Sequence, residues 1–129
     1  KQLVAEANAE IETVPVEEAK KLLGDENIVF IDIRDPRELA REGRIPGAMH
    51  MPRGMLEFWV DPDSPYYRDV FGTGKKFIFF CAGALRSALA TQQVQRMGLE
   101  PVAHLEGGFG AWRDADGPID APEPKPEKK

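Results

Sequence analysis

The sequence contains only one cysteine, Cys81, among its 129 residues. A single cysteine excludes an internal disulfide and a zinc site made of several cysteines. It leaves one free thiol, which is typical of a protein kept in a reducing compartment. We therefore expect a cytoplasmic protein, or a periplasmic one if the chain's first residue, Lys1, results from processing.

Long apolar runs and an excess of positive charge are also missing. No run approaches the roughly 20 apolar residues that cross a bilayer, and residues 1–10 lack the apolar core of a signal peptide. The net charge of −5 argues against a general nucleic-acid binder, which needs a basic surface. We expect no membrane and no nucleic-acid partner, and the length indicates one domain.

Short apolar runs alternate with helical patterns over residues 11–116, the predicted domain. Strand-like runs cover residues 27–33, 47–52, 76–80 and 101–106. Helical patterns cover residues 14–24, 35–43, 85–98 and 108–115. This alternation predicts an α/β domain with a mostly parallel sheet. Residues 1–10 are predicted to form a helical N-terminal extension, and the tail, residues 117–129, is rich in proline and charge and is predicted to be disordered.

Two further stretches carry local signals. Asp35, Pro36 and Glu38 have the spacing of a capped helix start with a capping box. Residues 55–75 fit neither the helical nor the strand period, and they hold five of the chain's eleven aromatic residues. A loop of this length is functional or partly helical more often than idle. These aromatics could line the site entrance or form a satellite core.

Cys81 lies where an apolar strand ends, and "CAGALRS" leads from it into a helix. Binding sites in parallel sheets lie beyond the carboxyl ends of strands. Small residues let successive N–H groups point inward, and together with the helix N-terminus they can stabilise a thiolate without a histidine base. The alternative is that Cys81 is a small buried hydrophobe.

Four stretches in sequence order resemble the rhodanese-homology family. They are "DIRDPRE" (32–38), "GRIPGAMHMP" (43–52), "CAGALRS" (81–87) and "LEGGFGAW" (105–112). The active loop of that family opens with the catalytic cysteine and often reads C-x-x-G-x-R followed by serine. The resemblance covers residues 11–115 and implies a parallel sheet flanked by helices on both faces.

The resemblance implies sulfur transfer through a persulfide on Cys81, the predicted catalytic residue. The predicted substrate-binding residues are Ala82, Gly83, Ala84, Leu85, Arg86 and Ser87. No cofactor and no metal are implied. The expected partners are small sulfur compounds such as thiosulfate, persulfides, cyanide and thiols, or a protein that donates or accepts persulfide sulfur. Arg86 either adds positive charge or braces the loop.

One loop position departs from the family pattern. The usual fourth-position glycine is replaced by Ala84, while the glycine stands one place earlier, at Gly83. If the fourth position requires a positive φ, Ala84 is strained there.

Most other marked residues are interpreted as structural. Asp32 and Arg34 are expected to form a carboxylate–guanidinium brace, and His50 and His104 to be satisfied structural histidines. Trp112 is expected in the core. Gly107 and Gly108 are expected to allow a tight turn near the loop. Arg53 is a better candidate than the histidines for extra positive charge near the site.

Three other functions remain as alternatives. A persulfide carrier or an interaction module without turnover would have the same motifs. A cysteine phosphatase or arsenate reductase is disfavoured because the phosphatase signature, C-x5-R, places its arginine six residues after the cysteine. Here the sixth residue is Ser87 and Arg86 is the fifth. A Cys–His hydrolase would need His50 or His104 within hydrogen-bonding distance of Cys81.

Overall fold

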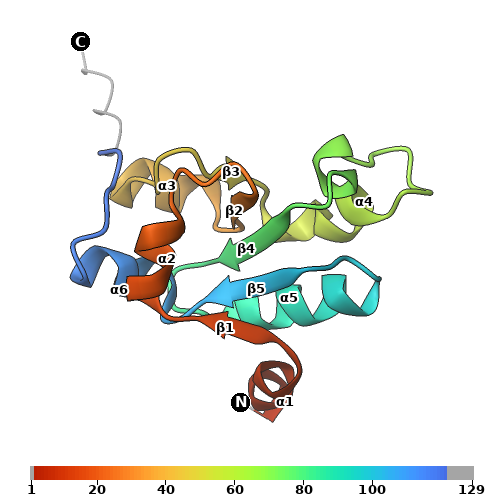
Figure 1. Ribbon diagram of the computed structural model, residues 1–129, viewed down its shortest axis with the longest axis horizontal. Coiled ribbons are helices and arrows are strands. Elements are labelled where there is room, and N and C mark those ends of the chain that lie inside the picture. Colours follow the sequence, from red (N-terminus) through yellow and green to blue (C-terminus); the bar gives the residue numbers. More distant parts are fainter. Residues whose placement is uncertain (1, 122–129) are drawn as a thin grey trace.

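A five-stranded parallel sheet forms the centre of the computed structural model, which describes residues 2–121 (Figure 1). The strand order is β1-β5-β4-β2-β3. The strands are β1 (Glu12–Val14), β2 (Ile28–Asp32), β3 (Met49–His50), β4 (Lys76–Phe80) and β5 (Val102–Leu105). The predicted α/β class with a parallel sheet is confirmed.

Within residues 2–121, six α-helices and two 3-10 turns connect and cover the strands. The helices are α1 (Gln2–Glu10), α2 (Val16–Leu22), α3 (Pro36–Glu42), α4 (Leu56–Val60), α5 (Leu85–Arg96) and α6 (Gly108–Asp114). The 3-10 turns are η1 (Arg53–Met55) and η2 (Asp69–Gly72). No helix within residues 2–121 has the length and apolar character needed to cross a membrane.

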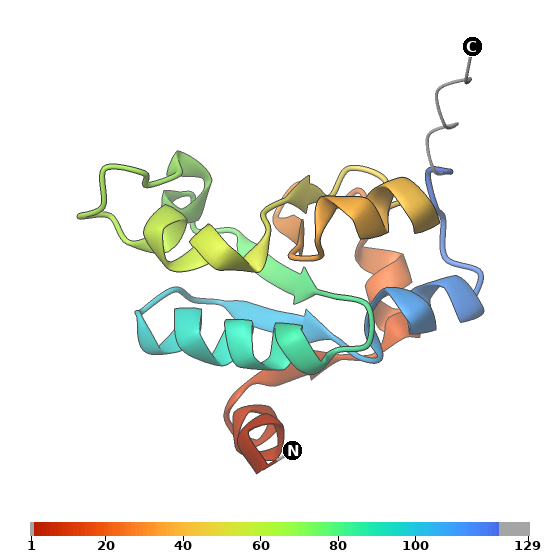
Figure 2. The same cartoon turned by 180° about the vertical axis from the view of Figure 1, so that it is seen from behind.

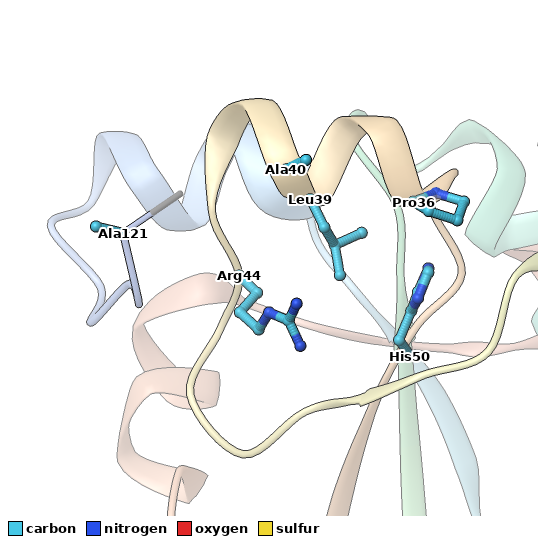
Figure 3. A pocket seen from close by; sticks show the side chains of 6 residues that line it. All are labelled: Pro36, Leu39, Ala40, Arg44, His50 and Ala121. Atoms are coloured by element: carbon cyan, nitrogen blue, oxygen red, sulfur yellow. The ribbon is translucent and has the colours of Figure 1, made fainter. Parts of the chain in front are cut away.

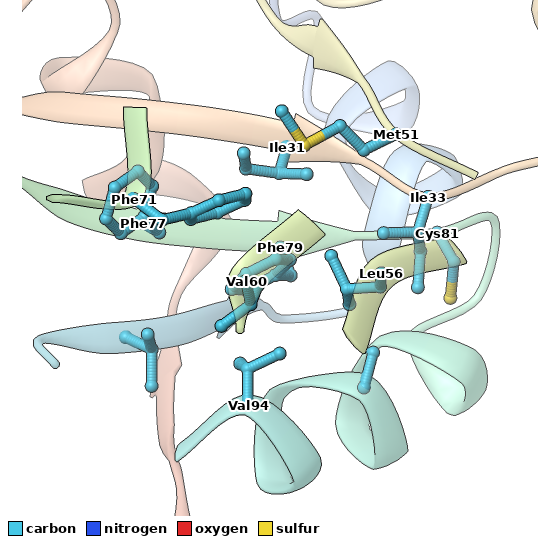
Figure 4. Close-up of a cluster of buried hydrophobic side chains, with 12 residues drawn as sticks. Ile31, Ile33, Met51, Leu56, Val60, Phe71, Phe77, Phe79, Cys81 and Val94 are labelled. Carbon is cyan, nitrogen blue, oxygen red and sulfur yellow. The ribbon is translucent and has the colours of Figure 1, made fainter. Parts of the chain in front are cut away.

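Side chains of β4 alternate between the two faces of the sheet and divide the core in two. Phe77, Phe79 and Cys81 belong to one cluster, which includes side chains of α4 and α5 (Figure 4). Ile78 and Phe80 belong to the other, which includes side chains of α2 and α6. Helices therefore cover both faces, as predicted, and α1 packs on α5 (Figure 2).

The sequence pattern located most elements but missed one strand. β1 has only three residues, two of them exposed, so it shows no apolar period. The expected strand at 47–52 shortens to Met49–His50. The 55–75 stretch is partly helical, since it contains α4 and η2.

The predicted tail is described only as far as Ala121. In this part, Arg44 and Asp120 exchange two backbone hydrogen bonds, of 3.1 and 2.8 Å. The Trp112 indole donates to the Pro118 carbonyl at 2.7 Å. Residues 117–121 therefore contact the domain, and residues 122–129 lie outside the described residues.

Candidate active site

Cys81 follows β4 directly, at the carboxyl end of the sheet, with its side chain in the core cluster of Figure 4. The residue is only 1% exposed. Its Sγ accepts a 3.3 Å hydrogen bond from the Ser87 N–H. Ser87 is the third residue of α5, so this N–H belongs to the first turn, whose N–H groups have no partner within the helix. The N-terminus of α5 is thus directed at the sulfur.

Ala84 provides the sharp turn that leads from the loop into α5. It lies in the left-handed region with φ 75° and ψ 2°, whereas Gly83 does not adopt this conformation. The fourth loop position therefore does require a positive φ, and an alanine there costs about 1 kcal/mol relative to a relaxed backbone. The loop keeps the path that favours glycine although its glycine is one place earlier.

The start of α6 holds the first two residues of the loop. The Phe109 N–H donates to the Cys81 carbonyl at 2.7 Å, and the Gly110 N–H donates to the Ala82 carbonyl at 3.0 Å. Gly108, with φ +65°, passes so close that a Cβ there would collide with both carbonyl oxygens. The predicted tight turn at Gly107 and Gly108 is confirmed, and its close approach orients the loop.

The guanidinium of Arg86 is held by Glu38 of α3. Arg86 Nη1 and Nη2 donate to the two carboxylate oxygens at 2.9 and 3.0 Å. These hydrogen bonds hold the pKa of Glu38 at about 2 and raise the pKa of Arg86. Glu38 also accepts the Asp35 N–H at 2.9 Å, which completes the predicted capping box. Of the two roles left open for Arg86, bracing is the one that this geometry supports.

An open cleft lies beside this ion pair. Its lining residues are Asp35, Arg37, Glu38, Arg41 and Arg86. The Arg37 side chain pairs with Asp35 at 3.1 Å, and this contact lowers the Asp35 pKa to about 2. The cleft therefore contains charges of both signs, and two of its three arginines are paired with carboxylates within it.

Asp32 and Arg34 form the expected buried brace. The closest of their contacts, from Arg34 Nη2 to Asp32 Oδ2, is 2.7 Å, and neither residue is more than 1% exposed. Arg34 also donates to the Gly43 carbonyl at 2.9 Å and lies 4.1 Å from the centre of the Phe109 ring. The brace thus connects the end of β2 to the segment after α3 and to α6.

His50 lies in a different pocket, between α3 and the segment that leads to β3 (Figure 3). Its Nε2 is 2.7 Å from the Arg34 carbonyl oxygen. The pocket is lined by Pro36, Leu39, Ala40, Arg44, His50 and Ala121. None of these is a residue of the Cys81 loop, so the structural interpretation of His50 is the one supported.

His104 is buried on β5, and both its ring nitrogens have partners. Nδ1 is 3.0 Å from Ser87 Oγ, and Nε2 is 3.1 Å from Thr13 Oγ1. Burial lowers the pKa of His104, so the ring is neutral at pH 7. Among residues 2–121, neither histidine hydrogen-bonds to the Cys81 sulfur. The Cys–His hydrolase arrangement is therefore not formed.

Some of the remaining marked residues are packed in the core, and the others lie on the surface of the protein. Arg53, predicted as extra positive charge, is paired with Glu57 at 2.7 Å. Trp112 is fully buried, as expected. Among the aromatics of 55–75, Phe58 and Tyr66 are more than half exposed and pack edge-to-face at 6.3 Å. The other three, Trp59, Tyr67 and Phe71, belong to the core cluster or pack against it.

Sequence reasoning missed three supports of the loop. The N–H groups of Phe109 and Gly110 act through the backbone, so their side chains give no signal. Glu38 was assigned to helix capping, and its second role depends on a partner 48 residues away. The Ser87–His104 contact was missed because a histidine in an apolar strand predicts only that a polar partner exists.

Strand β4, the Cys81 loop and helix α5 form one continuous strand–loop–helix unit within the parallel sheet. Residues 15–115 match the family model described as "Rhodanese-like domain". The chain therefore belongs to the rhodanese-like domain family, as the four sequence stretches predicted.

Two relatives of known sequence have names that agree with this assignment, and a solved structure is similar over most of the chain. The chain is 32% identical to a putative sulfurtransferase, YtwF, of Bacillus subtilis, over 80% of this chain and 88% of that protein. It is 31% identical to a sulfurtransferase of Allochromatium vinosum, over 81% and 90%. A solved Rhodopseudomonas palustris protein of unknown function, described as a possible tyrosine phosphatase, is 57% identical, with a TM-score of 0.89 over 92% of this chain and 91% of that one.

Proposed function

We propose that this protein is a sulfurtransferase that moves sulfane sulfur from a donor to a thiophilic acceptor through a Cys81 persulfide. The observation that carries the proposal is the position of Cys81 at the end of β4, with its Sγ accepting an N–H of the first turn of α5. An N–H donor and a helix N-terminus both favour negative charge on sulfur. The membership in the rhodanese-like family supports the same chemistry.

In the first half-reaction, the Cys81 thiolate attacks the outer sulfur of thiosulfate or of a persulfide. A bond forms between the two sulfurs, the donor's own sulfur–sulfur bond breaks, and sulfite or a thiolate leaves with its electron pair. In the second half-reaction, cyanide or a thiolate attacks the outer sulfur of the persulfide and regenerates the Cys81 thiolate. Both steps are displacements with covalent catalysis, and neither needs an oxidant or reductant.

The loop backbone is the part of the chain that would stabilise the charged sulfurs. The N–H groups of residues 82–87 follow Cys81 in the chain, and those of Leu85, Arg86 and Ser87 belong to the first turn of α5. Cys81 is nearly buried, whereas Gly83, Leu85 and Arg86 are exposed. Because Cys81 is buried, a donor reaches Sγ only after a local rearrangement of the residues around it. This burial favours a small donor, or a protein that carries its persulfide on an extended segment.

A persulfide carrier would share the first half-reaction and lack rapid turnover. The phosphatase alternative is raised by the Rhodopseudomonas relative, which is described as a possible tyrosine phosphatase. In this chain Arg86 stands five residues after Cys81, and its guanidinium is occupied by Glu38. A phosphate in the loop would have to compete with that carboxylate, so this geometry disfavours the phosphatase reaction.

Steady-state assays distinguish these functions. We expect the protein to form thiocyanate from cyanide with thiosulfate or a glutathione persulfide donor, and to leave p-nitrophenyl phosphate intact. Cys81→Ser should abolish thiocyanate formation while preserving the circular-dichroism spectrum. Phosphate release that depends on Cys81, with no thiocyanate from either donor, would refute the proposal, and one stoichiometric transfer without turnover would indicate a carrier.

A further inference from the structure

His104 and Ser87 connect the Cys81 loop to the far edge of the sheet. His104 is 2% exposed, and its side chain lies on the α5 side of β5 between two hydroxyl groups. Thr13 on β1 contacts Nε2, and Ser87 in the first turn of α5 contacts Nδ1. The contacts follow the strand register, because Thr13 is paired with His104 in the parallel ladder.

Ser87 contacts the His104 ring and the Cys81 sulfur through different atoms. Its Oγ is 3.0 Å from His104 Nδ1, while its backbone N–H donates to Cys81 Sγ at 3.3 Å. Ser87 is itself fully buried. Because the hydroxyl is tied to β5, the first turn of α5 is fixed relative to the strand, and the direction of the Ser87 N–H toward sulfur is fixed with it.

The His104 ring suits this role better than an apolar side chain of the same size. A buried serine hydroxyl without a partner is costly and tends to hydrogen-bond its own helix backbone instead. A neutral imidazole supplies one donor and one acceptor, which are enough for the two hydroxyls. Burial favours this neutral form by lowering the His104 pKa.

We infer that His104 is a positioning residue for sulfur transfer, acting on Cys81 through Ser87. The inference rests on the proposed function for its consequence in turnover. It assigns no proton transfer to His104, whose ring does not contact the sulfur. It predicts that the Nδ1 side of the ring matters for the reactivity of Cys81 and that the Nε2 side does not.

Two substitutions at His104 separate the sides of the ring. The side-chain amide of asparagine overlays Nδ1, so His104→Asn preserves the contact with Ser87 and loses that with Thr13. The amide of glutamine reaches the position of Nε2, so His104→Gln preserves the contact with Thr13 and loses that with Ser87. Thr13→Val removes only the contact between Thr13 and His104 Nε2. Ser87→Ala removes the hydroxyl that contacts His104 Nδ1 and keeps the backbone N–H that faces the Cys81 sulfur.

The first readout is the rate of iodoacetamide alkylation at pH 7, which reports only Cys81 because the chain has no other cysteine. The second is thiocyanate formation, with kcat and KM measured separately. We expect His104→Gln and Ser87→Ala to lower the alkylation rate and kcat three- to tenfold, with KM changed less than twofold. His104→Asn and Thr13→Val should stay within twofold of the wild type. Thermal unfolding confirms that each variant folds.

Equal alkylation rates in wild type, His104→Gln and Ser87→Ala would overturn the inference. So would an equal loss in His104→Asn and His104→Gln, since it would show a general packing effect. Alkylation does not depend on sulfur transfer. If the alkylation rates follow the expected order while no variant transfers sulfur, the positioning role stands and the proposed function fails.

Discussion

Ala84 holds a backbone conformation that glycine adopts at little cost. Its φ of 75° brings the chain from the Cys81 loop into α5. The sequence identified this position because its residue differs from the family pattern, and the structure shows that the turn itself is retained. The strain is therefore local, and the loop path does not change to relieve it.

Replacing Ala84 with glycine should stabilise the protein by about 1 kcal/mol, because the left-handed penalty of the Cβ disappears. Urea unfolding followed by circular dichroism measures this change. Gly83→Ala serves as the matched control, since Gly83 has an ordinary φ and open space around its Cα; alanine there should be neutral or slightly stabilising. An Ala84→Gly variant no more stable than wild type would contradict the strained turn.

At the scale of elements, the loop depends on three segments that are distant in sequence. α3 supplies Glu38, β5 supplies His104, and α6 supplies two backbone N–H groups. Local signals predicted all three of these elements, because capping residues, glycines and apolar runs act within a few residues of the chain. The contacts between elements could not be predicted, since they depend on how α3 and α5 pack around the end of the sheet.

The Glu38–Arg86 ion pair between α3 and α5 should reduce the reaction of dianionic donors. At pH 7 the carboxylate is ionised, because its pKa of about 2 lies far below that pH, and it offsets the charge of Arg86. Glu38→Gln keeps an acceptor for the Asp35 N–H and removes the negative charge. We expect kcat/KM for thiosulfate to rise three- to tenfold relative to that for a persulfide donor.

Glu10→Gln is the control for this prediction. Glu10 pairs with Arg96 at 2.9 Å, at the opposite end of the same helix α5. Its substitution should leave the ratio of the two kcat/KM values unchanged. A ratio that is unchanged in Glu38→Gln as well would show that the carboxylate does not determine the choice of donor.

At the scale of the whole molecule, Cys81 lies at the carboxyl end of β4, the end of a parallel sheet where binding sites are usually found. The class of the domain followed from alternating strand and helix patterns, and the family followed from four motifs in order. The strand order β1-β5-β4-β2-β3 did not follow from either, because sequence patterns contain no information on which parallel strands are neighbours. β1 was missed since it is a three-residue edge strand.

The fold also explains why Cys81 fits two interpretations from sequence alone. It is both a buried member of the core, in line with Phe77 and Phe79, and the residue to which α5 directs an N–H group. Burial limits the contact of the thiol with solvent, since Cys81 is only 1% exposed. A buried apolar residue and a nucleophile are therefore compatible with the same position of Cys81. A measurement of the reactivity of its sulfur distinguishes the two interpretations.

Intact-mass spectrometry tests persulfide formation on Cys81 most directly. After incubation with thiosulfate or glutathione persulfide, the wild-type chain should gain about 32 Da, one sulfur atom, and cyanide should remove it. Cys81→Ser should show no such gain under the same conditions. A wild-type chain whose mass is unchanged by either donor would contradict the central claim.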